Sequence, residues 1–155
     1  MNESVVITVP FGCLAIETYE DRLASIRFLP GDHPLSAPQR GGLAEEAVRQ
    51  VQAWLVDPHF VFSLPFLLQG SDFQRRVWQR IAAIPLAQTL SYGALAQELG
   101  SVARAVGGAC GRNPLPLVIP CHRVVAASGS GGFNQSAGRE TVSIKEWLLA
   151  HERRA

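Results

Sequence analysis

Several features that would define a class of protein are scarce in this sequence of 155 residues. No apolar run approaches the ~20 residues of a membrane-spanning helix, which argues against a helical membrane protein. Charged residues make up only 17% of the chain and apolar residues 47%, which excludes intrinsic disorder. The length fits one ordinary domain or two small ones, with a core large enough to fold without disulfide bonds.

Cysteine is also scarce. The three cysteines, Cys13, Cys110 and Cys121, cannot all pair, so we expect no disulfide framework. Free thiols are typical of a reducing compartment, which favours a cytoplasmic location. The polar and acidic start, Met1 to Ser4, does not resemble a secretory signal.

Acidic and basic side chains are unevenly distributed along the chain. Residues 1–70 contain four Arg and eight Asp or Glu, a net charge of −4, whereas residues 71–155 contain ten Lys or Arg and five Asp or Glu, a net charge of +5. The basic half suggests a polyanionic partner, and a chance distribution of surface charge is the alternative. Thirteen of the fourteen basic side chains are Arg, whose fork suits phosphate, although a genome rich in G and C would give the same bias.

The first half predicts a strand-rich domain, residues 1–70, that contains one helix. Short runs of β-branched residues alternate with turn residues, and the stretch from Leu43 onward places apolar residues at helical spacing. The expected elements are strands at 5–9, 13–18 and 24–28, turns at 10–12 and 20–22, a loop at 30–42, a helix at 43–56 and a connector at 57–71.

The second half, residues 71–155, predicts a helical domain. Ser71 or Asp72 can cap a first helix, and Ser91 and Ser101 can cap two more that Gly100 separates, which matches a helix-turn-helix. The sequence from Ser143 to Glu146 is a capping box that should open the last helix. The other expected elements are strands at 117–119 and 123–126 and a flexible loop at 129–138. Together the halves predict an α/β fold, with the strand-rich domain packed on a winged-helix-like domain.

The segment around Cys121 carries the clearest chemistry. A cysteine attacks only as the thiolate, and the adjacent His122 is a candidate base for forming it. Neighbouring residues on an extended strand point to opposite faces, so a bridging water is plausible between the two side chains. Such a base needs an orienting carboxylate, and Glu152 at the end of the last helix is one candidate.

Each of these residues also has an ordinary structural interpretation. A lone cysteine in an apolar stretch is usually a small buried hydrophobe, and Tyr92 after a capping serine is more often part of a core. A metal site from Cys110, Cys121, His122 and His151 is conceivable, but no metal-binding spacing supports it. Arg104 is less usual, because small residues surround it and would allow the backbone of a nucleic acid or of a neighbouring helix to approach closely.

The ordered motifs from residue 71 to 152 resemble the O6-alkylguanine-DNA alkyltransferases. The run Ile119-Pro120-Cys121-His122-Arg123-Val124-Val125 is similar to the active-site motif of that family. The other matches are Phe73-Gln74 with Val77-Trp78, Ser91-Tyr92-Gly93 with Leu95-Ala96, Arg104-Ala105-Val106-Gly107, Asn113-Pro114, and Lys145 to Glu152. The amino-terminal half matches only in general layout.

The resemblance implies a role for each matching residue. It makes Cys121 the alkyl acceptor, His122 the base that deprotonates it through water, and Glu152 the carboxylate that orients this base. Asn113 would hold the active-site turn, Tyr92 would help to rotate the target nucleotide, and Arg104 would fill the vacated base stack. Ser91 and Ala105 join the residues expected at DNA, and the expected lining of the alkylguanine pocket is Cys110, Pro116, Val124 and Phe133.

The resemblance also implies the reaction. An O6-alkylated guanine is flipped out of double-stranded DNA, and its alkyl group is transferred irreversibly to Cys121, once per molecule and without a cofactor. We expect a monomer that contains no structural zinc and does not associate with a membrane. O4-alkylthymine stays open as a second substrate.

Two departures from the family pattern accompany the resemblance. About two residues are missing from the turn between Gly100 and Arg104, and the loop that includes Phe133 is about five residues longer than in many members. The alternatives are a non-catalytic lesion sensor of the same superfamily, which the presence of Cys121 argues against, and a winged-helix regulator with an incidental cysteine. A cysteine hydrolase is more distant, since no residues suggest an oxyanion hole.

Overall fold

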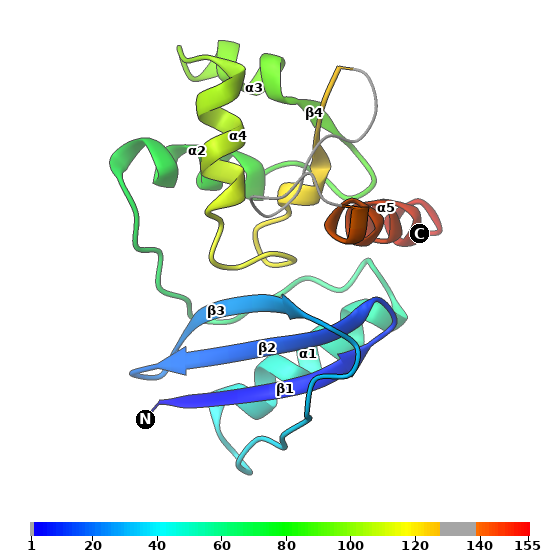
Figure 1. The fold of residues 1–155 in the computed structure, drawn as a ribbon. Coiled ribbons are helices and arrows are strands. Elements are labelled where there is room, and N and C mark those ends of the chain that lie inside the picture. The colour runs from blue at the N-terminus through cyan, green and yellow to red at the C-terminus, as the bar shows by residue number, and fades with distance from the viewer. Residues whose placement is uncertain (1, 128–138) are drawn as a thin grey trace. The chain divides into compact units, whose positions relative to one another are not determined.

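The computed structural model describes residues 2–127 and 139–155, which form two compact units, Met1–Leu68 and Gln69–Ala155 (Figure 1). In these two ranges no helix combines the length and the apolar character needed to cross a membrane.

The first unit is an antiparallel meander with one helix on it. Strands β1 (Glu3–Val9), β2 (Gly12–Tyr19) and β3 (Arg22–Leu29) pair in the order β1-β2-β3. The β2–β3 turn consists of Glu20 and Asp21, both at positive φ (49° and 61°), as a two-residue hairpin of the primed type requires. All three strands are found where the sequence predicts them, each two or three residues longer.

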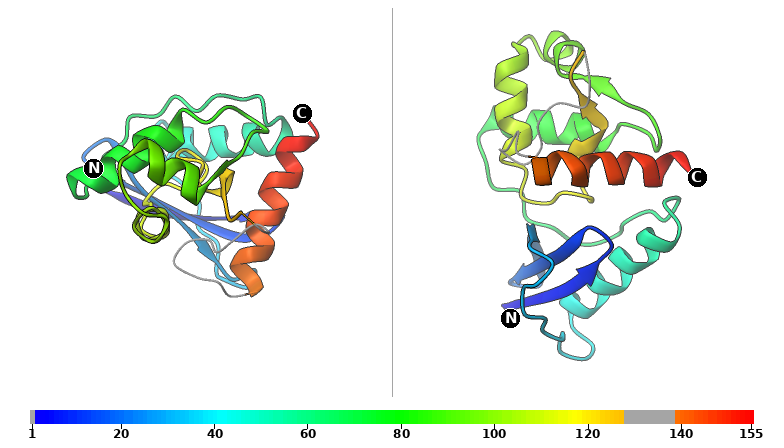
Figure 2. Two further views of the ribbon diagram at one scale, coloured as in Figure 1. Left: turned by 90° about the horizontal axis from the view of Figure 1, so that it is seen from above. Right: turned by 45° about the vertical axis from the view of Figure 1, so that its right-hand side comes forward.

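Helix α1 (Leu43–Val56) packs against the three strands of this sheet (Figure 2). Its buried face contains Ala47, Val48, Val51 and Trp54, in agreement with the predicted periodicity. Gln50 on the same face is buried as well, because its amide exchanges hydrogen bonds with Ser63: the Ser63 N–H donates to Oε1 at 2.9 Å, and Nε2 donates to the Ser63 carbonyl at 3.3 Å. The apolar pattern alone did not reveal this polar contact.

The second unit is mainly helical. Helix α2 (Asp72–Ala82) begins at the predicted Ser71 cap, which forms a full capping box with Gln74. The indole N–H of Trp78 donates to the Ala109 carbonyl at 2.9 Å and ties α2 to α4. The remaining elements are β4 (Leu90–Ser91), α3 (Tyr92–Glu98), α4 (Ala103–Gly111), the 3₁₀ turn η1 (Cys121–Arg123), β5 (Val124–Val125), which pairs in parallel with β4, and α5 (Arg139–Arg153).

The turn between α3 and α4 is a Schellman motif. Gly100 adopts a φ of +66° after α3, its N–H donates to the Gln97 carbonyl, and the Ser101 N–H donates to the Ala96 carbonyl at 2.9 Å. The prediction that Ser101 caps the next helix is therefore wrong, because Ser101 completes the end of α3. Helix α4 begins two residues later with Val102 as its N-cap, which makes no side-chain capping bond.

Three other predictions in this unit need correction. No strand forms at 117–119, where prolines at 116 and 120 flank a turn in which Leu117 has a φ of +77°. The strand predicted at 123–126 is reduced to β5, because the chain enters it from the turn η1. Helix α5 begins at Arg139, so the predicted capping box at Ser143 lies inside the helix. The predicted loop at 129–138 lies entirely outside the described residues.

Candidate active site

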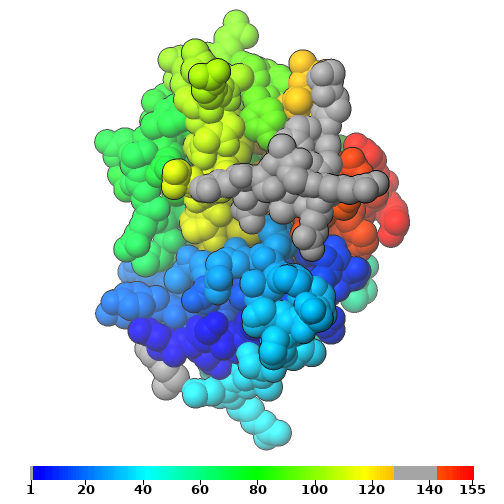
Figure 3. Space-filling view, viewed as in Figure 1, coloured from blue at the N-terminus to red at the C-terminus, as the bar shows by residue number. Residues whose placement is uncertain are grey.

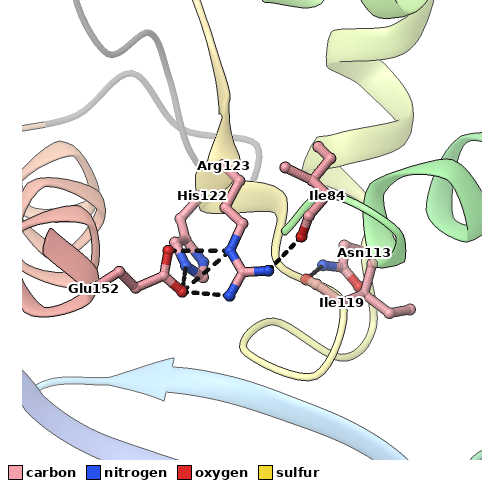
Figure 4. A network of polar contacts seen from close by, with 6 residues as sticks. All are labelled: Ile84, Asn113, Ile119, His122, Arg123 and Glu152. Atoms are coloured by element: carbon pink, nitrogen blue, oxygen red, sulfur yellow. Dashed lines mark hydrogen bonds and ion pairs between the residues drawn. The ribbon is translucent and has the colours of Figure 1, made fainter. Parts of the chain in front are cut away.

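Asn113 organises the segment that leads to Cys121. Its side-chain Nδ2 donates to the Ile119 carbonyl at 2.8 Å and to Cys121 Sγ at 3.1 Å. Its Oδ1 accepts from the Leu115 N–H at 2.9 Å, so one buried amide bonds to both arms of the turn. Figure 4 shows Asn113 beside Ile119. The segment has three prolines and therefore few backbone N–H donors. The side-chain amide of Asn113 supplies hydrogen bonds that regular secondary structure would otherwise provide.

Cys121 lies at the start of η1 and is only 2% exposed. Burial raises the pKa of its thiol well above the ordinary value, and the neighbouring thiol of Cys110 adds to this rise. The hydrogen bond from Asn113 and the charge of Lys145 act in the opposite direction. The thiol is therefore protonated at neutral pH, and a base must remove its proton before the sulfur can attack.

His122 and Glu152 form a completely buried pair. The imidazole Nε2 lies 2.9 Å from Glu152 Oε2, and both side chains are about 1% exposed. Burial lowers the pKa of His122 and outweighs the opposing effect of Glu152, so the imidazole is neutral at pH 7. Burial acts to raise the pKa of Glu152, but hydrogen bonds from His122 and Arg123 bring it down to about 2. The pair thus consists of a neutral imidazole and a carboxylate.

The backbone around Cys121 differs from the predicted strand. Cys121 and His122 occupy a 3₁₀ turn, so the alternation of side chains along a strand does not apply to them. Figure 4 shows His122 and Arg123 directed from this turn toward Glu152 on α5. The structure therefore brings Asn113, Cys121, His122 and Glu152 into one region from three parts of the sequence.

Lys145 is a site residue whose contacts sequence reasoning missed. This only lysine of the chain is fully buried, and its Nζ lies 3.2 Å from the hydroxyl of Tyr92 and 5.3 Å from the centre of its ring. Burial lowers its pKa to about 8, although the thiols of Cys110 and Cys121 oppose this shift. A signal was present in the sequence, because Lys145, Leu148 and Glu152 share one helical face with i, i+3 and i+7 spacing.

The residues predicted to contact DNA lie at the amino-terminal ends of α3 and α4, with Ser91 as the N-cap of α3. Ser91 caps α3 by accepting from the Ala94 N–H at 3.0 Å, and Tyr92 is half-buried. Arg104, the second residue of α4, is exposed, and Ala105 is partly exposed. Figure 3 shows the α3–α4 segment, in yellow-green, at the surface. Ser91 therefore has a structural task inside the protein, while Arg104 is accessible.

The predicted pocket residues have different surroundings. Cys110 is buried near the end of α4, and its interaction with the Cys121 thiol lowers its pKa, whereas burial acts to raise it. Pro116 and Val124 are buried, and Phe133 lies outside the described residues. In the part of the chain that the structure describes, no group of three or more His, Cys, Asp or Glu is placed to hold a metal ion. His151, the fourth candidate ligand, stacks on Trp147 with 5.0 Å between ring centres.

Known proteins resemble this chain in sequence. The family described as "6-O-methylguanine DNA methyltransferase, DNA binding domain" matches residues 72–154. Curated methylated-DNA–protein-cysteine methyltransferases are similar in sequence: that of Mycolicibacterium paratuberculosis is 37% identical over 99% of this chain and 94% of its own length, and that of Salmonella typhimurium is 39% identical over 88% and 79%.

Solved structures agree as well. The O6-methylguanine methyltransferase of Mycobacterium tuberculosis superimposes with a TM-score of 0.81 at 31% identity, covering 99% of this chain and 94% of that one. The M. tuberculosis OGT in complex with DNA gives a TM-score of 0.80 at 34% identity, covering 96% and 92%. The α/β fold inferred from the sequence is confirmed by these matches. By its sequence and its fold, the chain belongs to the 6-O-methylguanine DNA methyltransferase family.

Proposed function

We propose that this protein repairs DNA by direct reversal of damage, transferring the alkyl group of O6-alkylguanine in double-stranded DNA to Sγ of Cys121. One observation carries the proposal. In a chain of this family, the buried Cys121 thiol accepts a hydrogen bond from Asn113, and the next residue is a neutral imidazole hydrogen-bonded to a carboxylate. These are the parts that a protonated nucleophile needs, namely a base and a group that orients the base.

The transfer balances with protein and DNA alone. Because Glu152 is ionised and only accepts hydrogen bonds, His122 donates its Nε2–H to it, and Nδ1 is left as the basic nitrogen. The thiol proton passes to Nδ1, directly or through water. Sulfur then bonds to the alkyl carbon while the bond from that carbon to O6 breaks. The electron pair of the broken bond stays on guanine, which takes up the proton held by His122. No cofactor enters this step. The thioether is not a disulfide and does not exchange with thiols, so each molecule reacts once.

The helix-turn-helix of the second unit supplies the proposed DNA surface. Arg104 is exposed near the start of α4, where it can enter a base stack opened by the flipped nucleotide. Two glycines further along α4 have no explanation in the described chain, since an added Cβ at Gly107 or Gly108 would meet nothing within 4 Å beyond its chain neighbours and its own helix backbone. Glycine inside a helix costs about 0.5–1 kcal/mol, and a bare backbone allows a phosphate chain to approach. Residues 71–155 thus combine DNA binding and catalysis.

The proposal extends to how the protein binds. A net charge of +5 on residues 71–155 favours phosphate contacts, so binding should weaken as salt increases and show little sequence preference. The protein should act as a monomer. Tyr92, whose hydroxyl lies 3.2 Å from Nζ of Lys145, is proposed to contact the rotated nucleotide.

A single experiment tests the proposal. The protein is incubated with a duplex that carries one O6-methylguanine, and intact and tryptic masses are compared with those of Cys121→Ser and Cys110→Ser. Trypsin separates the two candidate thiols, because Arg112 lies between them. We expect one methyl group on the peptide 113–123 of the wild type and of Cys110→Ser, and none on Cys121→Ser. Selective binding to the lesion without any methyl gain would instead indicate a non-catalytic lesion sensor. Absence of both the methyl gain and the selective binding would leave the winged-helix regulator as the remaining alternative.

A further inference from the structure

Arg123 has more contacts with Glu152 than His122 has. Its Nε lies 3.0 and 3.1 Å from the two carboxylate oxygens, and its Nη2 lies 2.6 Å from Oε2, the oxygen that also meets His122. Its Nη1 donates to the Ile84 carbonyl at 2.6 Å. Figure 4 shows this guanidinium between Glu152 and Ile84. The fork is therefore fixed at both ends, by α5 and by the residues that follow α2.

The contacts determine which hydrogen bonds Glu152 can make. An arginine has only donors, so both carboxylate oxygens are acceptors toward Arg123. A proton on the carboxyl group would have to displace the guanidinium from a site that is 1% exposed. Oε2 can therefore only accept from Nε2 of His122, and the imidazole must carry its hydrogen there.

The charge of Arg123 also acts on His122 directly. In the described part of the chain, the charged groups that act on the imidazole are Glu152 and Lys145 of α5 and Arg123 of its own turn. Glu152 favours the imidazolium ion, and the two cations disfavour it. Without Arg123, the buried carboxylate would keep only His122 as a close partner among the described residues, and the two would share a proton as an imidazolium–carboxylate pair. An imidazolium cannot accept the thiol proton.

We propose that Arg123 is a positioning residue for the transfer reaction: by holding both oxygens of Glu152, it keeps His122 neutral and keeps its basic nitrogen at Nδ1. This inference rests on the proposed function for its kinetic consequence, but the state of the imidazole is testable without DNA. A merely structural Arg123 would tie α5 to α2 and leave the protonation of His122 unchanged when replaced by a side chain of similar length.

The test uses the full chain and the variants Arg123→Met and Arg123→Lys. Ring nitrogens of His122 are observed by ¹H–¹⁵N spectroscopy from pH 5 to 9, and His122→Gln assigns the signals. Wild type should show the neutral Nε2–H tautomer at pH 7. Arg123→Met should show an imidazolium there, and Arg123→Lys, which keeps the charge, should resemble wild type.

Transfer rates give the second measurement. Arg123→Met should react about tenfold more slowly than wild type at pH 6 and within about twofold of it at pH 8, because only the acid limb moves. Arg27→Met, which removes an exposed ion pair of the first unit, is the matched control and should change nothing.

The inference is overturned if Arg123→Met leaves His122 neutral at pH 7, or if it slows transfer equally at every pH. If this variant does not fold, the wild-type spectrum still decides, since an imidazolium or an Nδ1–H tautomer at pH 7 contradicts the proposal. Absence of transfer by wild type at every pH would refute the proposed function, while the spectrum would continue to test Arg123.

Discussion

The two units of this protein differ in whether their ionisable side chains are exposed or buried. In residues 2–68 the buried polar side chains are Thr18 and Gln50, and every Asp, Glu, His and Arg is at least partly exposed. In the described part of the second unit, the buried polar side chains are Asn113, His122, Lys145, His151 and Glu152. Burying ionisable groups is costly, and they gather where chemistry needs shifted pKa values. Among the described residues, the buried ionisable groups therefore lie in the second unit, which holds the candidate site.

The largest expected effect comes from breaking the buried ion pair. Glu152→Ala leaves the guanidinium of Arg123 without its carboxylate and should lower the free energy of unfolding by about 3–5 kcal/mol. Glu17→Ala removes the exposed partner of Arg27 in the first unit and should cost less than about 1 kcal/mol. Urea titration gives both values, and hydrogen exchange locates the loss in each unit. Equal losses would contradict the contrast between the units.

The second effect concerns duplex DNA. Arg104→Ala should slow repair of O6-methylguanine in a duplex by about tenfold or more, because holding an unstacked step open costs a few kcal/mol. Reaction with free O6-alkylguanine, which needs no flipping, should be nearly unchanged. Arg49→Ala, an exposed arginine of the first unit, is the control and should affect neither rate. Equal losses on both substrates for Arg104→Ala would refute its insertion into the stack.

The third effect is a pH dependence that arises from the buried lysine of the second unit. Burial lowers the pKa of Lys145 from 10.5 to about 8, so between these values the unfolded chain binds more protons than the folded one. The contribution of Lys145 therefore makes the free energy of unfolding rise with pH across this window. The buried Cys121 thiol acts with opposite sign there, so the observable is the difference between wild type and Lys145→Met. We expect the variant to show the smaller rise or the steeper fall; parallel curves would contradict this assignment.

The smallest effect compares two glycines. Gly108→Ala should stabilise α4 by about 0.5–1 kcal/mol, because the site is open, and should nevertheless weaken DNA binding. Gly41 in the first unit is equally open but has a φ of +77°, so Gly41→Ala should destabilise by about 1 kcal/mol and leave DNA binding unchanged. Thermal unfolding and a salt-controlled binding titration measure both. Unchanged DNA binding by Gly108→Ala would indicate that this face of α4 does not meet DNA.

Local signals explain what could be predicted from the sequence. The cap at Ser71, the face of α1 and the stop at Gly100 each depend on residues within one or two turns, and the structure confirms them. The failures involve distant partners. The segment at 117–119 looked like a strand, but Asn113 and the prolines impose a turn on it. The ion pair between Arg123 and Glu152 joins residues that are 29 positions apart, and no periodicity in the sequence predicts it. The candidate residues could be predicted from the sequence, but the pairs that they form could not.

The 2% exposure of Cys121 has a consequence for how long the protein stays useful. A molecule that reacts once is lost whenever its sulfur meets any other electrophile first. Soluble alkylating agents and oxidants attack accessible thiolates, and a buried, protonated thiol offers them neither access nor charge. The number of lesions that a cell can repair equals the number of unreacted copies it holds. Burial of this one sulfur therefore preserves repair capacity between encounters with damaged DNA.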